Sequence, residues 1–212
     1  MLYFKKVESE DEFSEVYKLR YNVYCQEKKF EQENEHPDQI EVDEYDVYAV
    51  HFLAKKNDRV VGTARMILNN PIGFPAEKHC KLNISIEGMK KERTVEVSRF
   101  AISKDAARST GCNRQEIVLG LIREIYQEGR RLGVKYFYAA MCKGFQKVLL
   151  NCGIMFLQVG PEVDYHGKRA PYITWMKNIE DGLFMKDINL FRYVTLSDNL
   201  SCSRNALTYT GK

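Results

Sequence analysis

The chain has 212 residues, of which 44% are hydrophobic and 29% are charged, and its formal net charge is +3. This length and composition are typical of one large globular domain with a substantial core. No apolar run approaches the roughly 18 residues that a membrane-spanning helix needs, and the first residues lack the apolar core of a signal peptide. The six cysteines show no C-x-x-C spacing, so we expect no metal site and no disulfide framework, but reduced thiols in the cytoplasm.

The charge is unevenly distributed along the chain. Residues 8–46 hold 14 acidic and 4 basic residues, a balance of −10, which leaves +13 for the rest. Such an asymmetry can steer an acidic partner toward the later part of the chain. Nucleic acid is not expected as a partner, because no basic run or basic motif interleaved with aromatic residues is present.

The first predicted helix covers residues 11–30. Its apolar stripe includes Phe13, Val16 and Tyr17, with the spacing of a helix face that is packed against a core. Arg20 lies on the same stripe, where an unpaired charge would be costly. We therefore expect an opposite charge close to Arg20.

Two antiparallel strands are predicted after this helix. The acidic, turn-rich residues 31–46 are expected to form an ordered loop. The β-rich runs 47–56 and 60–68 follow, and the intervening "NDR" is a plausible hairpin turn. Residues 69–79 contain Pro and Gly at the spacing of a loop.

The second half of the chain alternates strands and helices, without repeats or low-complexity segments. The predicted elements are a strand at 94–103, a helix at 114–133, a strand at 134–141, a short helix at 143–153, strands at 154–160 and 170–177, and a helix at 180–194. We expect a single domain over residues 1–195 and a mobile C-terminal tail over residues 196–212.

This order predicts an α/β fold, a three-layer α/β/α sandwich with a mixed central sheet. A strand–helix–strand unit places two strands parallel, and 94–103 and 134–141 are the candidates. If these two strands splay apart, the sheet opens into a V-shaped cleft between them.

Several charged residues interrupt apolar segments and predict one buried network. These residues are Arg20, Asp43, Asp46, Arg65, Glu96 and Arg99. Buried arginines are tolerated when carboxylates pair with them, and three of each can satisfy one another. The alternative is a set of separate surface salt bridges, which contribute little.

The stretch "TVEVSRF" places Glu96 and Arg99 three residues apart, so a regular strand would point them to opposite faces. A β-bulge would bring both to one face and would free a backbone N–H from the ladder. That donor can stabilise the oxyanion of a thioester under attack, and Glu96 can act as general base on an incoming amine.

The segments "LRYNVYCQEKKFE", "DEYD", "GTARM" and "VEVSRFAIS" together resemble the acyl-homoserine lactone synthases, the N-acyl amino acid synthases and the exosortase-associated acyltransferases. All of these have the GNAT-like acyltransferase fold. The resemblance spans roughly residues 15–175. It assigns the family's E-x-S-R motif to Glu96, Ser98 and Arg99 as catalytic residues. It assigns the family's other charged positions to Arg20, Asp43, Asp46 and Arg65.

Two departures from the lactone synthase pattern guide the choice among these relatives. Tyr24 and Phe30 stand where lactone synthases generally have Phe and Trp, and residues 164–173 look more like the other two branches. The favoured reading is transfer of a long-chain fatty acyl group from an acyl carrier protein to the amine of an amino acid or similar molecule. A lactone synthase using S-adenosylmethionine and a non-catalytic binding domain are the alternatives.

The same resemblance indicates how the donor is held. Coenzyme A-dependent GNAT enzymes bind pyrophosphate in a Gly-containing loop before a helix. The equivalent "RSTGCN" matches in part, with Arg108, Gly111 and the following Arg114, while Asn113 replaces a small residue. This partial match suits the single phosphate of phosphopantetheine better than coenzyme A, and an ordinary capped loop is the alternative.

Two further sets of residues complete the expected site. A basic docking face for the acidic carrier protein is predicted at Arg123, Arg130, Arg131, Lys143 and Lys147. An apolar acyl pocket is predicted at Phe137, Met141, Phe145, Leu149 and Phe156, although residues at such spacings also form ordinary cores. His166 is a further candidate, with a structural turn position as its alternative.

Overall fold

A computed structural model of the chain describes residues 1–83 and 91–196. Its central sheet has the order β1-β2-β3-β4-β5-β8-β6, and β7 pairs with β8 outside this path. The strands are β1 (Leu2–Lys6), β2 (Ala49–Lys56), β3 (Arg59–Ile67), β4 (Thr94–Ile102), β5 (Tyr136–Met141), β6 (Leu157–Gln158), β7 (Val163–Asp164) and β8 (Lys168–Trp175). The β4–β5 pair is parallel, while the neighbouring pairs along the path are antiparallel. The expected mixed sheet is therefore confirmed.

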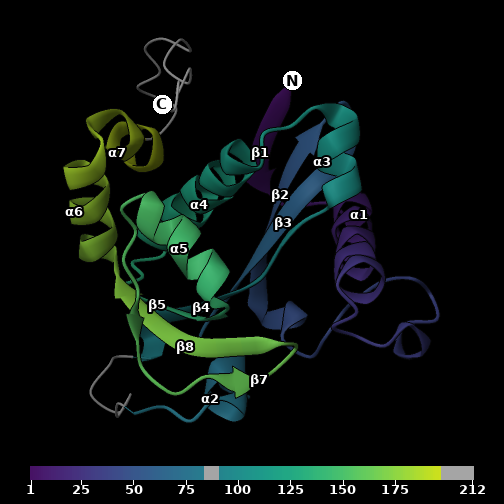
Figure 1. Cartoon of the computed structure of the whole chain (residues 1–212), viewed down its shortest axis with the longest axis horizontal. Coiled ribbons are helices and arrows are strands. Elements are labelled where there is room, and N and C mark those ends of the chain that lie inside the picture. The colour runs from purple at the N-terminus through teal and green to yellow at the C-terminus, as the bar shows by residue number, and fades with distance from the viewer. Residues whose placement is uncertain (84–90, 197–212) are drawn as a thin grey trace.

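Helices cover both faces of this sheet (Figure 1). The α-helices are α1 (Glu10–Tyr21), α2 (Pro75–His79), α3 (Lys104–Thr110), α4 (Arg114–Arg131), α5 (Lys143–Asn151), α6 (Met176–Lys186) and α7 (Ile188–Thr195). α1 packs over β3 and β4 on one face, and α4 packs on the other face over β1, β2 and β3. The sheet between these helices forms the predicted three-layer α/β/α sandwich.

The parallel strands part after only three paired positions. The register of β4 and β5 runs from Thr94 opposite Tyr136 to Glu96 opposite Tyr138 and stops there. Beyond this point both strands continue without pairing to each other. The V-shaped cleft predicted between these two strands is thus present, with its apex at Glu96 and Tyr138.

A β-bulge lies in β4 where the sequence predicted one. Arg65 pairs with Ser98 and Thr63 pairs with Ala101, so β4 holds one more residue than β3 over this interval. Arg99 occupies the left-handed region with φ of +49°, which bends the strand.

The first helix is shorter than predicted. α1 begins after a capping box formed by Ser9 and Glu12, ends at Tyr21, and continues as a π-helix over Asn22–Glu27. The wider π-helical turn changes the side-chain spacing, which a 3.6-residue period does not reveal. This turn directs Tyr24 toward the cleft.

Other differences from the sequence prediction are local. β1 was not predicted, and residues 75–79 form the short helix α2 within an expected loop. The expected helix 180–194 is two helices, because Asp187 leaves the helical conformation and caps α7 by accepting from the Asn189 and Leu190 amides. The hairpin turn was predicted correctly, with Asn57 and Asp58 both at positive φ.

The predicted C-terminal tail lies outside the described residues from residue 197 onward. In the described ranges, none of the helices has the length and hydropathy needed to cross a membrane.

Candidate active site

Three arginines and three carboxylates form one ionic network on the α1 face of the sheet. Its members are Arg20, Arg65, Arg99, Glu41, Asp43 and Asp46. The arginines come from α1, β3 and β4, and the carboxylates come from the loop that leads into β2. The network is electrically neutral, so the buried charges balance.

Asp46 links Arg20 and Arg65 by accepting hydrogen bonds from both. Arg20 is fully buried and donates from Nε to Glu41 Oε2 at 2.5 Å and from Nη1 to Asp46 Oδ1 at 2.7 Å. Arg65 donates from Nη1 to the same Asp46 oxygen at 2.7 Å and binds Asp43 through both terminal nitrogens. Such multidentate pairs fix the orientation of the guanidinium groups.

The bulged residue Arg99 closes the network. Its Nη2 lies 2.9 Å from Glu41 Oε1 and 3.0 Å from Asp43 Oδ2. The guanidinium also lies over the ring of Tyr24, 5.5 Å from its centroid. The π-helical turn and the bulge therefore meet at this contact.

The network corrects one expectation: the third carboxylate is Glu41 and not Glu96. Burial alone would raise the pKa of Glu41, but Arg20 and Arg99 lower it to about 2. Asp46 has a pKa of about 2 for the same reasons, with Arg20 and Arg65 outweighing its burial. Glu41 precedes Asp43 by two residues, and in an extended loop this spacing puts both side chains on one side, a signal that was present in the sequence.

Glu96 stands apart from the ion pairs of the described residues. It is 1% exposed, and its Oε2 accepts a hydrogen bond from the Ala76 amide at 2.9 Å. Burial raises the pKa of Glu96 to about 7, although the Ala76 bond and the Arg65 charge oppose this rise. A carboxyl group with such a pKa can exchange protons near neutral pH.

Ser98 connects Glu96's strand to the network. Its hydroxyl accepts a hydrogen bond from Arg65 Nε at 3.0 Å. The structure therefore gives Ser98 a contact that orients Arg65.

A cavity of about 430 Å³ begins where β4 and β5 part. Its walls include all five residues that the sequence predicted for an acyl pocket, namely Phe137, Met141, Phe145, Leu149 and Phe156. The bulge residues Ser98 and Arg99 line it as well, so the ionic network and the apolar space are adjacent.

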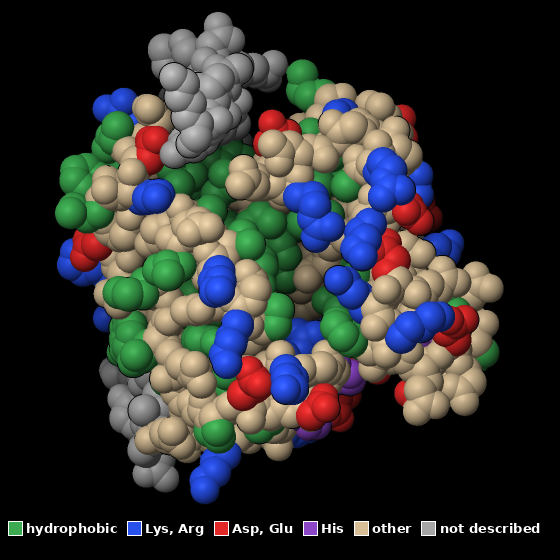
Figure 2. Space-filling model, viewed as in Figure 1, with side chains coloured by type: hydrophobic (Ala, Val, Ile, Leu, Met, Phe, Trp, Pro, Cys, Tyr) green, Lys and Arg blue, Asp and Glu red, His purple; other side chains and the backbone are tan. Residues whose placement is uncertain are grey.

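The charged residues that line this cavity are all cationic. They are Lys28, Arg99, Arg114, Lys168 and Arg169, and no Asp or Glu of the described residues joins them. Figure 2 shows a hollow with hydrophobic side chains inside and Lys and Arg side chains on either side of it. The cavity suits a ligand with an apolar chain and an anionic group.

Two segments from opposite arms of the cleft meet beside the cavity. The Phe30 ring contacts the Arg169 guanidinium at 5.4 Å, and His166 Nδ1 lies 3.1 Å from Glu31. A side chain at Gly167 would crowd the Phe30 ring, with 3.2 Å to its nearest atom. His166 therefore has a bridging position between the two arms.

The expected phosphate-binding residues are only partly brought together. Arg114 lines the cavity, whereas Arg108 is an exposed residue in the last turn of α3 and Gly111 is the left-handed C-cap of that helix. Asn113 caps α4 by accepting from the Gln115 amide, which explains why it is not a small residue.

The expected docking residues differ in their surroundings. Arg123 and Arg130 donate to the carbonyl oxygens of Tyr193 and Thr195 in α7, and Arg131 pairs with Glu128. The other two residues, Lys143 and Lys147, are exposed on α5. A docking face shared by all five residues stays a prediction, and two of its arginines also hold α7 in place.

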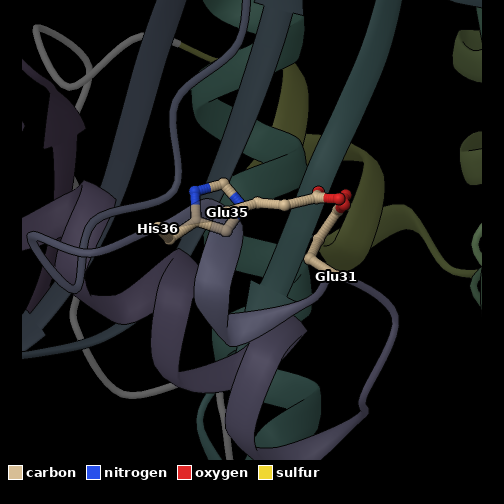
Figure 3. A group of neighbouring side chains, drawn as sticks. All are labelled: Glu31, Glu35 and His36. Atoms are coloured by element: carbon tan, nitrogen blue, oxygen red, sulfur yellow. The ribbon is translucent and has the colours of Figure 1, made fainter.

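One group of side chains has the proximity of metal ligands. Atoms of Glu31, Glu35 and His36 all lie within 4.8 Å of one another (Figure 3). Glu31 already pairs with His166 and lies 3.7 Å from Arg99, and Glu35 is exposed. This cluster by itself does not define a metal site.

Comparisons with known proteins agree with this geometry. Residues 19–117 match the model of the acetyltransferase (GNAT) domain. An acyl-homoserine-lactone synthase of Vibrio anguillarum is 24% identical over 151 residues, which cover 70% of this chain and 77% of that protein.

Two solved structures show the same fold. The acyl-homoserine lactone (AHL) synthase LasI superposes with a TM-score of 0.65 at 17% identity, covering 87% of this chain and 94% of that chain. FeeM, an N-acyl amino acid synthase from uncultured soil microbes, superposes with a TM-score of 0.63 at 13% identity, covering 88% of this chain and 97% of that chain. The chain therefore has the GNAT-like fold that the resemblance implied.

Proposed function

We propose that this acyltransferase of GNAT-like fold transfers a long-chain fatty acyl group from the thioester of an acyl carrier protein to the amine of an amino acid or a similar small molecule. The observation that supports this most is the position of the cavity. An apolar space with cationic lining begins at Val97, the residue after the buried Glu96, whose pKa is about 7.

The donor is argued from the lining of the cavity. The apolar interior suits an acyl chain, and Lys28, Arg114 and Lys168 suit the phosphate of phosphopantetheine and the acidic surface of a carrier protein. A carrier-bound donor is favoured over coenzyme A because the α3–α4 turn is short and capped by Asn113.

The acceptor enters as an ammonium group, which has no free electron pair for attack. Glu96 takes one of its protons, and the amine nitrogen then bonds to the thioester carbonyl carbon. The carbon–sulfur bond breaks, and the sulfur leaves and takes up a proton. The products are an amide and a free thiol, with the net release of one proton.

The bulge provides stabilisation for the intermediate. Arg99 and Phe100 have no partners in the β3 register, and both line the cavity. A backbone N–H of this bulge is the proposed donor to the oxyanion of the tetrahedral intermediate.

An acyl-homoserine lactone synthase is the second candidate. The curated relative with this activity aligns over 70% of the chain, which favours S-adenosylmethionine as the acceptor. The positions that differ from the lactone synthase pattern, Tyr24 and Phe30, both line the cavity and favour a different acceptor. A non-catalytic domain that only binds an acyl carrier is the third candidate.

The test measures thiol release and product mass with the purified full chain. Palmitoyl carrier protein is offered with each of the twenty amino acids and with S-adenosylmethionine, beside the variant Glu96→Gln. Release with an amino acid that is lost in the variant supports the proposal, and release with S-adenosylmethionine alone supports the second candidate. Binding of the donor without any release supports the third.

The exposed Glu92→Gln provides a matched control, because it removes a carboxylate close in sequence to Glu96 but outside the network. It is expected to retain the wild-type rate. Equal losses in both variants would contradict a specific role for Glu96.

A further inference from the structure

The hydroxyl group of Tyr138 is buried without a hydrogen-bond partner among residues 1–83 and 91–196. The residue is 1% exposed. A buried polar atom without a partner destabilises a protein, so its presence calls for a physical reason.

Among the described residues, Tyr45 Oη and His51 Nδ1 are also buried without a hydrogen-bond partner. The Lys78 ammonium lies 5.1 Å from the centroid of the Tyr45 ring, and the other ring nitrogen of His51 lies 3.4 Å from the Asp46 carbonyl oxygen. Tyr138 has no such cation or second polar contact in the part of the chain that the structure describes.

Tyr138 lies at the apex of the cleft. It is opposite Glu96 at the last paired position of β4 and β5, so the two side chains leave the same face of the sheet side by side. The next residues along these strands, Val97 and Ala139, line the cavity from the opposite face of the sheet, so Glu96 and Tyr138 lie next to the cavity in sequence but are not part of its lining. The Tyr138 ring packs against Phe74, with 6.3 Å between the centroids.

The electrostatic surroundings of this hydroxyl favour a cation. Burial raises its pKa, and the carboxylates of Glu77 and Glu96 raise it further. Arg65 and Arg99 lower the pKa of Glu96 by their charge, but their guanidinium groups pair with Asp43, Asp46 and Glu41 and donate no hydrogen bond to the Tyr138 hydroxyl.

We propose that Tyr138 and Glu96 together bind the amine of the acceptor, an inference that rests on the proposed N-acyltransferase function. An ammonium group has three N–H donors. One donates to the Glu96 carboxylate and a second donates to the hydroxyl oxygen of Tyr138. When Glu96 takes its proton, the bond to Tyr138 keeps the nitrogen oriented toward the point where β4 and β5 part, where the thioester carbon of the donor is proposed to lie.

This assignment defines the acceptor by its chemistry. The hydroxyl and the carboxylate recognise a primary amine that arrives as a cation, while the cationic lining of the cavity recognises the donor. The two substrates therefore enter regions of opposite electrostatic character.

The test compares Tyr138→Phe with Tyr136→Phe, steady-state kinetics being measured with the acceptor that the wild-type chain uses fastest. Tyr136 is on the same strand and face, two residues further from the cleft, and is half-buried. For Tyr138→Phe we expect the KM of the acceptor to rise about tenfold, as for the loss of one hydrogen bond to a charged group. The KM of the acyl donor should stay unchanged, and the melting temperature should not fall, because the lost oxygen has no hydrogen-bond partner among the described residues. Tyr136→Phe should resemble the wild type.

An unchanged acceptor KM in Tyr138→Phe would overturn the inference and leave the proposed function intact. A fall in melting temperature with equal changes in both KM values would also overturn it, because it would indicate a structural role. If the folded wild-type chain releases no thiol with any amine, the proposed function itself fails, and the inference fails with it.

Discussion

Ser98 and Arg99 are consecutive residues of β4, yet both side chains bind the same ionic network. Ser98 accepts from Arg65, and Arg99 donates to Glu41 and Asp43. The bulge makes this possible by reversing the alternation of the strand. Accordingly, Ala101 packs under α1, whereas Phe100 packs on the opposite face. One inserted residue thus joins the network, the cavity and an unpaired stretch of backbone.

The buried Glu96 should make the stability of the chain depend on pH. A pKa of about 7 in place of the usual 4.5 means that the folded state binds the proton more tightly than the unfolded state. The stabilisation is complete below pH 4.5 and is lost as the pH rises through 7. This difference corresponds to about 3 kcal/mol at most.

Glu96→Gln removes this dependence, so its melting temperature relative to the wild type should rise between pH 5 and pH 8. Thermal unfolding at pH 5 and at pH 8 measures this difference in melting temperature, with Glu92→Gln as the control. A difference between variant and wild type that is the same at both pH values would contradict a buried, protonatable Glu96.

The network should respond strongly to loss of one arginine. Arg20→Ala leaves three buried carboxylates with two arginines, because Glu41 and Asp46 each lose one of their two guanidinium partners, and a loss of about 3–5 kcal/mol in the free energy of unfolding is expected. The control Arg131→Ala breaks an exposed pair with Glu128 and should change stability by less than about 1 kcal/mol. Chemical denaturation measures the free energy of unfolding of both variants. Similar losses in Arg20→Ala and Arg131→Ala would argue against a buried network.

The cationic lining of the cavity should govern donor recognition. In the double variant Arg114→Ala/Lys168→Ala, we expect the KM for the acyl carrier protein to rise about tenfold above the wild-type value at low salt. The difference from the wild type should be smaller at high salt. Lys177→Ala removes an exposed cation that pairs with Asp181 on α6, outside the cavity lining and the expected docking residues, and should leave this KM unchanged. Identical salt dependence in the double variant and the wild type would show that the carrier binds elsewhere.

The size of the cavity should select the acyl chain. Ala139 is buried in the cavity wall, and Ala139→Leu adds volume where the chain is proposed to lie. Turnover should fall for long acyl chains and be retained for short ones in a donor series of increasing length. The exposed Leu157→Ala should not change the preference. An equal loss at every chain length would place the acyl group outside this cavity.

Much of the site was predictable because its residues conflict with their local pattern. Arg20 and Arg65 interrupt apolar elements, so a buried charge partner was expected for each. Glu96 and Arg99 have a spacing that a regular strand does not allow on one face, so the bulge was expected as well.

The remainder depends on tertiary contacts. Glu41 has the spacing from Asp43 that puts both on one side of the loop, but it lies among many other acidic residues, and the positions of Arg20 and Arg99 are needed to single it out. Arg123 and Arg130 look like free helix cations until α7 packs beside them. The Tyr138 hydroxyl, which lacks a hydrogen-bond partner within the described ranges, is not predictable from the sequence, because its position depends on where β4 and β5 part.

The pH dependence of kcat/KM, measured for the wild type and Glu96→Gln with a saturating acyl donor, tests the central claim most directly. We expect the wild-type rate to rise with pH to a plateau, with a midpoint near the Glu96 pKa of about 7. The variant should lose about a hundredfold or more and should lack this midpoint. A variant that retains both the rate and the midpoint would contradict Glu96 as the general base.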